Sequence, residues 1–140
     1  MKRLIIISIT LIILLISGGI LYSKVIQRPL HQSICKQDIS DIQVYGSVGT
    51  KKIEDVVSID NIIEWFNQAS DIRINKDFAG TTPESGIIIN LKSGKRILIL
   101  NSGSDFEIQR DDVRPKNASY WAKQQDIKVY LERLVAGADK

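Results

Sequence analysis

Two regions of this chain differ in how their apolar residues are arranged. Residues 4–22 read LIIISITLIILLISGGILY, a run of 19 residues without a charge. At 1.5 Å per residue a helix of this length nearly spans a hydrocarbon core of ~30 Å, so we predict a transmembrane helix within residues 1–23. From residue 39 onward the apolar residues recur in short alternating or helical patterns, which is typical of a folded domain.

The charges before the apolar run predict that this domain is exported. Lys2 and Arg3 precede the run without any acidic residue, which favours a cytoplasmic N-terminus and an extracytoplasmic domain. A cleavable signal peptide, with Gly19 near the cleavage site, is the competing interpretation. We favour an uncleaved signal-anchor in the cell membrane because residues 20–22 continue the apolar run past that site.

The remainder of the chain divides into a tether and one domain. Residues 24–38 contain Pro29 and mixed polar side chains without periodicity, so we predict a tether there. Residues 39–137 carry the regular patterns. Their number suits one domain with one core.

The patterns within residues 39–137 predict an α+β fold. Short apolar or alternating runs predict strands at 42–45, 53–57, 71–75 and 106–108 and a hairpin of residues 86–92 and 95–101. Helical spacing joins Ile59, Ile62, Ile63 and Phe66, and again Ile127, Tyr130, Leu131 and Leu134. Residues 120–122 fit either an edge strand or the start of a helix. We therefore expect a small antiparallel sheet with two packed helices.

The ends of the two helices carry recognisable signals. Ser58 or Asp60 is expected to cap the first helix, which should end near Ser70. Gly137 stands where a helix C-terminus usually has glycine, so the second helix should end there.

The hairpin has the strongest local signal and supplies the first candidate surface. A two-residue turn at Ser93 and Gly94 would place Ile87, Ile89 and Leu91 on one face with Leu98 and Leu100, and we expect that face to be core. The other face then carries Ile88, Ile97 and Ile99. Cover by another part of the chain is the favoured interpretation of that second face, and a patch that binds a partner is the alternative.

Three aromatic residues are further candidates for partner binding. Trp65, Tyr120 and Trp121 are large amphipathic rings of the kind that carry much of the energy at protein interfaces. A place in or beside the core explains each of them more simply.

The distribution of charge argues against nucleic acid as a partner. The whole chain has a net charge of +3, but four basic residues flank the apolar run and every acidic residue lies beyond it. From Pro29 onward there are 15 basic and 16 acidic residues, a net charge of −1. A near-neutral domain lacks the basic stripe that phosphate binding requires.

Few residues are available for catalysis or metal binding. Cys35 and His31 are the only residues of their types, and both fall in the predicted tether. One chain therefore cannot form a disulfide, a cysteine-rich zinc site, or a catalytic triad within its domain. We expect no cofactor and no bound metal, and we interpret Cys35 as an inert thiol.

Carboxylates offer the one remaining route to an enzyme. Asp105, Glu107, Asp111 and Asp112, with Glu84 on a loop, are candidates for an acid and base pair acting on wall polysaccharide. Alternation with apolar neighbours and nearby arginines favours a charged surface instead. We expect a protein that is not an enzyme.

The order of elements resembles one group of proteins. The strand at 42–44, the helix through Trp65 and Phe66, the hairpin around Leu91-Lys92-Ser93-Gly94-Lys95-Arg96, and residues 120–134 look like the small exported domains of uncharacterised Gram-positive membrane-anchored proteins and lipoproteins. The likeness covers residues 39–135 and implies an exported domain of unknown function with no catalytic residues. Unlike the lipoproteins, this chain lacks a lipidation motif before Cys35.

These observations together predict a membrane-anchored extracytoplasmic protein of the cell envelope. Its domain is expected to bind another envelope protein or a wall component without catalysing a reaction. Secretion after cleavage of the N-terminal segment is the alternative.

Overall fold

The computed structural model describes residues 29–75 and 83–137 of the chain. The predicted transmembrane helix and most of the predicted tether, residues 1–28, lie outside the described residues. Within the described ranges, no helix has the length and apolarity to cross a membrane. The anchor and its cleavage therefore stay predictions.

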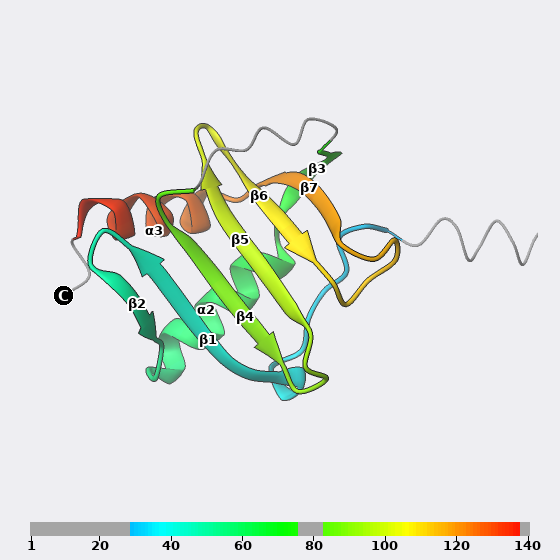
Figure 1. Ribbon diagram of the computed structural model, residues 1–140, viewed down its shortest axis with the longest axis horizontal. Coiled ribbons are helices and arrows are strands. Elements are labelled where there is room, and N and C mark those ends of the chain that lie inside the picture. The colour runs from blue at the N-terminus through cyan, green and yellow to red at the C-terminus, as the bar shows by residue number, and fades with distance from the viewer. Residues whose placement is uncertain (1–28, 76–82, 138–140) are drawn as a thin grey trace, which may run out of the picture.

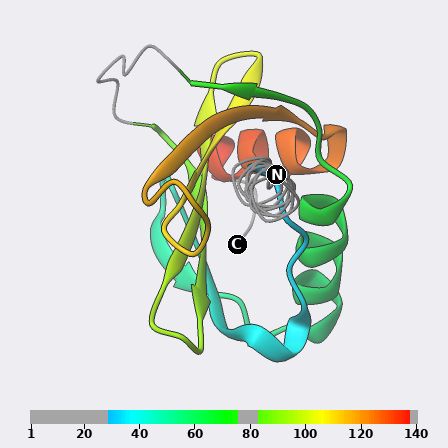
Figure 2. The ribbon, with the colours of Figure 1, turned by 90° about the vertical axis from the view of Figure 1, so that its right-hand side faces the viewer.

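The described residues form an antiparallel sheet of seven strands with two helices packed on one face (Figures 1 and 2), which confirms the predicted α+β class. The strands are β1 (Ile39–Gly46), β2 (Gly49–Lys52), β3 (Ser70–Ile74), β4 (Gly86–Leu91), β5 (Arg96–Ser102), β6 (Asp105–Arg110) and β7 (Ala118–Lys123). The helices are α2 (Val56–Asn67) and α3 (Gln125–Ala136), preceded by a short 3₁₀ helix, η1 (Lys36–Asp38).

The strand order is β2-β1-β4-β5-β6-β7-β3, so one helix must connect the two edges of the sheet. The β1–β2 hairpin forms one edge, and α2 then runs beneath the sheet to β3 at the other edge (Figure 1). β7 lies between β6 and β3. Residues 120–122, for which the sequence allowed an edge strand or a helix, thus belong to an interior strand.

The core lies between the sheet and the two helices. The predicted helical stripes point into it: Ile62, Ile63 and Phe66 of α2 and Ile127, Leu131 and Leu134 of α3 are buried. They pack against the inward face of the strands, whose largest fully buried residues are Ile42, Ile87, Ile89, Ile97, Ile99, Phe106, Ile108 and Tyr120. Burial of these isoleucines and aromatic rings supplies most of the stabilisation.

The helix ends match the prediction at one helix and differ at the other. Gly137 ends α3 in the left-handed conformation, with φ +67°, as predicted. Helix α2 begins earlier than predicted because the Asp55 carboxylate accepts a hydrogen bond from the Ser58 backbone N–H at 2.8 Å and acts as the cap. The predicted strand at 53–57 is therefore wrong, and that segment turns into the helix.

The predicted register of the β4–β5 hairpin is wrong by one residue. The loop contains three residues rather than two, since the Leu91 N–H donates to the Lys95 carbonyl at 2.9 Å and Gly94 has φ +80°. A type I turn followed by a left-handed glycine is the usual three-residue connection. Ile97 and Ile99 consequently pair with Ile89 and Ile87 on the inward face.

This shift exchanges the two faces of β5, because side chains alternate along a strand. Ile97 and Ile99 are fully buried in the core, so they form no exposed patch for a partner. The outward face carries Ile88, Leu98 and Leu100 instead. Neither helix covers that face (Figure 2); Leu100 is nevertheless buried, and the other two side chains are half-buried.

The predicted tether is wrong in its second half. Ile34 is buried, with 7% of its surface exposed, and Leu30 packs against the core. Residues 29–35 therefore belong to the folded unit, which was predicted to start at residue 39.

Candidate functional site

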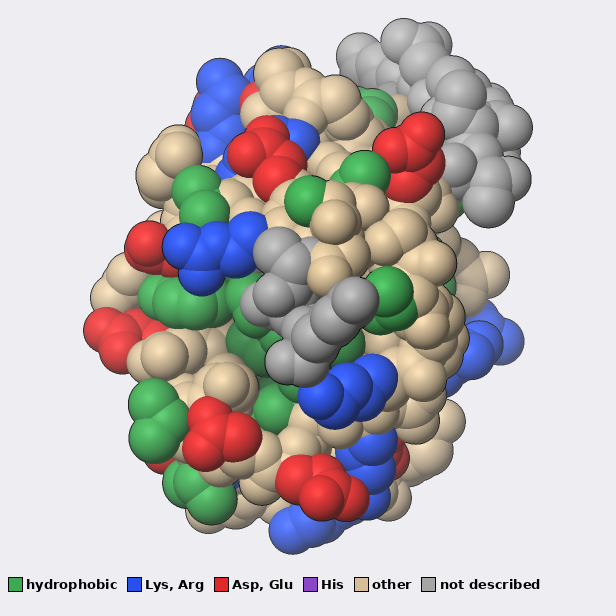
Figure 3. All heavy atoms as spheres, turned by 90° about the vertical axis from the view of Figure 1, so that its left-hand side faces the viewer, with side chains coloured by type: hydrophobic (Ala, Val, Ile, Leu, Met, Phe, Trp, Pro, Cys, Tyr) green, Lys and Arg blue, Asp and Glu red, His purple; other side chains and the backbone are tan. Residues whose placement is uncertain are grey.

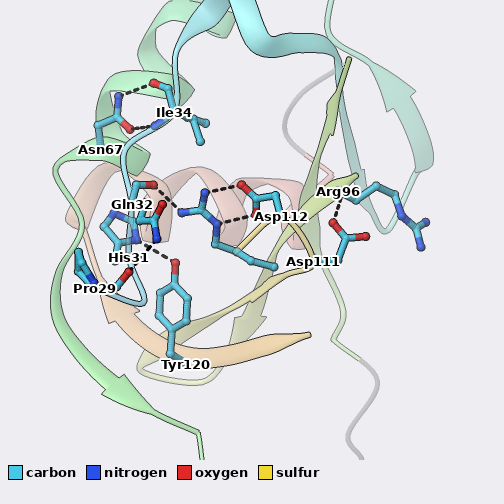
Figure 4. Close-up of polar contacts among 10 residues, drawn as sticks. Pro29, His31, Gln32, Ile34, Asn67, Arg96, Asp111, Asp112 and Tyr120 are labelled. Atoms are coloured by element: carbon cyan, nitrogen blue, oxygen red, sulfur yellow. Dashed lines mark hydrogen bonds and ion pairs between the residues drawn. The ribbon is translucent and has the colours of Figure 1, made fainter. Parts of the chain in front are cut away.

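The segment of residues 29–35, here called the N-terminal clamp, is held on the domain by polar and apolar contacts (Figure 4). Asn67, the last residue of α2, binds the backbone of Ile34 twice. The Ile34 N–H donates to Asn67 Oδ1 at 2.8 Å, and Asn67 Nδ2 donates to the Ile34 carbonyl at 3.0 Å. The side-chain amide of Asn67 thus makes the two hydrogen bonds that the backbone of a neighbouring strand would make, and it fixes the clamp against the end of the helix.

His31 is the centre of the clamp. Its Nε2 donates to the Phe66 carbonyl at 2.9 Å, and its Nδ1 accepts from the Tyr120 hydroxyl at 3.0 Å. Both bonds are satisfied by a neutral imidazole with its proton on Nε2. Burial lowers the pKa of His31; the Phe66 carbonyl acts in the opposite direction, and the nearby charge of Arg110 lowers the pKa further.

Arg110 joins the clamp to the end of β6. Its side chain is 1% exposed, and Nε and Nη2 donate to the two carboxylate oxygens of Asp112 at 2.9 and 2.7 Å. Nη1 donates to the Gln32 carbonyl, and the guanidinium lies 5.3 Å from the centre of the Phe66 ring. This buried charge is paired, hydrogen-bonded and packed, as a stable buried arginine must be.

Tyr120 is part of this network rather than a partner-binding residue. It is fully buried beneath the clamp, and burial raises its pKa to about 12. The hydroxyl therefore stays protonated and keeps donating to His31 at physiological pH.

The clamp has the properties of a structural joint rather than of a catalytic site. Every buried side-chain nitrogen and oxygen among the described residues has a hydrogen-bond partner. The same residues contain no group of three or more histidine, cysteine, aspartate or glutamate side chains able to hold a metal ion. The buried polar side chains that hold the clamp are therefore all engaged within the chain.

A cleft of about 710 Å³ lies between the β1–β2 hairpin, the start of α2 and the end of α3. Figure 1 shows the β1–β2 hairpin at the end of the molecule opposite the clamp. Its lining combines apolar residues with charged residues: Val44, Gly46, Val48, Gly49, Lys51, Lys52, Ile53, Glu54, Asp55, Ser58, Tyr130 and Leu134. Its volume is in the range of sites that hold small ligands or peptide side chains.

Helix α3 passes very close to Gly46, one of the residues that line the cleft. A Cβ atom at residue 46 would lie 2.4 Å from the Leu134 carbonyl oxygen, so only glycine fits. The same carbonyl accepts a hydrogen bond from the Ser47 N–H at 3.2 Å. The helix end is thereby fixed against the hairpin.

One exposed valine lines the cleft, and two more are chain neighbours of the lining residues Asp55 and Ser58. Val48 on the β1–β2 turn and Val56 and Val57 in the first turn of α2 are 62%, 58% and 65% exposed. They are three of the four large apolar residues exposed in the described part of the chain, the fourth being Ile74. Figure 3 shows apolar side chains interspersed with acidic and basic ones on this end. Clustered exposed apolar residues mark an interaction site.

Strand β2 adds an open backbone edge beside the cleft. It pairs only with β1 in the described sheet, and all four of its residues are exposed. An edge strand can accept a further strand from another chain.

The sequence-predicted candidates lie in three different places. Trp65 is half-buried and its ring lies 6.2 Å from that of Tyr130, which lines the cleft. Trp121 and Ile88 lie on the outward face of the sheet, away from the cleft. Ile97, Ile99 and Tyr120 are in the core. The structure thus brings one candidate, Trp65, next to the cleft.

Four of the five candidate carboxylates are engaged by neighbours, whereas Glu84 is exposed on its loop. Asp105 pairs with Arg73, and Asp112 pairs with Arg110. Glu107 accepts hydrogen bonds from Asn75, Gln109 and Ser119, and Asp111 accepts one from the Arg96 backbone N–H at 2.7 Å. These contacts favour roles in holding strands and turns together.

The sequence matches no protein-family model, and comparison with curated proteins and with solved structures finds no match. The resemblance to exported Gram-positive domains therefore stays a prediction, and function must be argued from the structure.

Proposed function

We propose that this protein is a single-pass, membrane-anchored protein of the cell envelope whose extracytoplasmic α+β domain is a non-enzymatic binding module. The 19-residue uncharged run and the basic residues before it support the membrane address. The engaged carboxylates and the fully hydrogen-bonded clamp support binding rather than catalysis.

The cleft is the proposed binding site, and the observation that carries this proposal is the presence of three exposed valines in or beside its lining, at positions 48, 56 and 57. Leaving Val48, Val56 and Val57 in water forgoes stabilisation that burial would give, roughly 1.5 kcal/mol or more for each side chain. A partner that covers them would recover it. The proposed partner is an extended peptide segment of another envelope protein, added alongside β2.

An extended peptide fits both features of this end. Its backbone would pair with the free edge of β2, and its alternate side chains would point toward the cleft. Apolar side chains at every second position would meet Val48 and Ile53. Lys51 and Lys52 keep the edge soluble when it is unoccupied.

Site-specific photo-crosslinking in intact cells tests this proposal. A photo-reactive amino acid replaces Val48 in one strain and Ile74 in another. Both positions are 62% exposed, so the second is a matched control on the opposite edge of the sheet. We expect a discrete protein adduct from position 48 that is absent from position 74.

A second substitution tests whether formation of that adduct depends on the exposed valines. Val57→Asp places a charge among the exposed valines without disturbing the core, so the adduct from position 48 should be lost while the domain stays folded by circular dichroism. Equal adducts from both positions, retention of the adduct in Val57→Asp, or attachment to polysaccharide instead of polypeptide would refute the peptide site.

A further inference from the structure

The N-terminal clamp shortens the connection between the domain and the predicted transmembrane helix, and so limits the distance of the domain from the membrane. The sequence pattern alone leaves residues 24–38 as a tether, but the structure holds residues 29–35 on the domain through Asn67, Arg110 and Tyr120. Only residues 23–28 then separate the predicted transmembrane helix from the folded unit.

This remaining connection is short compared with the domain. The seven residue steps from Tyr22 to Pro29 reach at most ~25 Å even when fully extended. A domain of about 100 residues has a radius of gyration of about 13 Å and measures roughly 34 Å across. The end of the domain at which the described chain begins must therefore stay beside the bilayer.

The β6–β7 loop, residues 111–117, lies at that end beside the clamp (Figures 1 and 4). Its acidic residues are occupied, because Asp112 pairs with Arg110 and Asp111 accepts a hydrogen bond from the Arg96 backbone. Arg114 and Lys116 are exposed, and neither pairs with a carboxylate among the described residues.

We propose that the β6–β7 loop rests on anionic phospholipid headgroups of the membrane that holds the anchor, with Arg114 and Lys116 as the contacting cations. The inference rests on the proposed membrane address. Lys24 and Arg28, which follow the predicted transmembrane helix in the sequence, carry charge of the same sign. The β1–β2 hairpin, which lines the cleft, lies at the far end of the long axis (Figure 1), so the cleft would point away from the bilayer, toward other envelope proteins.

Depth-dependent quenching on the full-length chain tests this orientation. Cys35 is the only cysteine and is exposed, so a Cys35→Ser background accepts one fluorescent probe, at Lys116→Cys or at Val48→Cys. The Lys116→Cys probe replaces one of the two cations and leaves Arg114 as the cation that contacts the headgroups. The protein is reconstituted into phosphatidylcholine vesicles with or without phosphatidylglycerol, each containing lipids with a headgroup nitroxide. We expect several-fold stronger quenching at position 116 than at position 48, and a larger difference with phosphatidylglycerol.

Two variants separate the charge of the loop from the length of the connection. Arg114→Glu should weaken the quenching at position 116 in phosphatidylglycerol vesicles and leave that at position 48 unchanged. A glycine-serine insertion between Arg28 and Pro29, as long as the predicted tether, should reduce the difference between the two probes.

The possible failures are distinguishable. A full-length chain that does not float with vesicles refutes the anchor and with it the proposed membrane address. A chain that floats but shows equal quenching at positions 116 and 48 refutes only the orientation. Quenching at 116 that is insensitive to phosphatidylglycerol and to Arg114→Glu refutes the headgroup contact.

Discussion

The two ends of this domain differ in which groups they bury: the clamp buries a charged side chain, and the cleft end leaves apolar side chains exposed. At the clamp, Arg110 is 2% exposed and each of its nitrogen groups has an acceptor. At the cleft, three valines remain more than half exposed beside an unpaired strand edge. The clamp end is complete within one chain, whereas the cleft end has the properties of a surface that another molecule completes.

This comparison distinguishes residues of the clamp, which stabilise the fold, from residues at the cleft, which remain exposed and can contact a partner. Substitutions at the clamp should act on stability, because a buried charge without its partner is costly. Substitutions at the cleft should leave stability nearly unchanged and act on binding. Four measurements test this division, from the largest expected change in the free energy of unfolding to the smallest.

Removal of the buried arginine should have the largest effect. Arg110→Leu leaves Asp112 without its partner and the Gln32 carbonyl without a donor, so we expect a loss of about 3 kcal/mol in urea unfolding. Arg114→Leu on the exposed loop is the matched control and should change stability by no more than ~0.5 kcal/mol. A loss below about 1 kcal/mol for Arg110→Leu would contradict the structural role of the clamp.

The corrected hairpin register predicts a contrast between adjacent residues. Ile99→Ala creates a cavity in the core and should cost about 3 kcal/mol, whereas Leu98→Ala on the outward face should cost about 1 kcal/mol. Urea midpoints of the two variants measure the difference. A larger loss of stability for Leu98→Ala than for Ile99→Ala would instead support the two-residue turn, in which Ile97 and Ile99 lie on the outward face.

The neutral state of His31 predicts a pH dependence of stability. The pKa of His31 is lowered in the folded protein, chiefly by burial, while the unfolded chain has the usual value near 6.5. The unfolded state therefore binds the proton more readily, and stability should fall as pH decreases below about 6.5. Since His31 is the only histidine, His31→Gln should remove this dependence between about pH 5 and 7. An equal slope in both proteins would exclude His31 as its source.

The cleft valines should have the smallest effect on folding. Val48→Ser and Val57→Ser remove exposed methyl groups only, so each should change stability by no more than ~0.5 kcal/mol. The same variants should weaken binding of the peptide partner, measured with the protein identified by crosslinking. A large loss of stability would show that these valines belong to the core of the domain.

Local patterns predicted the elements well where the signal is contained in a few neighbouring residues. The stripe of Ile62, Ile63 and Phe66 and the glycine after α3 needed only helical spacing and the backbone freedom of residue 137. The hairpin register failed because Ser93 and Gly94 fit a two-residue or a three-residue loop. One residue of difference reverses the face of every following side chain.

The clamp failed for a different reason. Residues 29–35 have no periodicity because their partners lie far away in sequence: His31 binds Tyr120, 89 positions later, and Phe66, 35 positions later. A single histidine in a polar segment gives no local sign of such contacts. The cleft was missed likewise, since its lining combines residues from β1, β2, α2 and α3.

The sequence by itself determined the α+β class, the two amphipathic helices and the limit of one histidine and one cysteine per chain, because these depend on residue type and on short-range periodicity. The tertiary structure alone decided which isoleucines face the core, where the folded unit begins and which end carries the exposed valines. Those properties depend on strand register and on contacts between distant segments, which form only when the whole chain closes around its core.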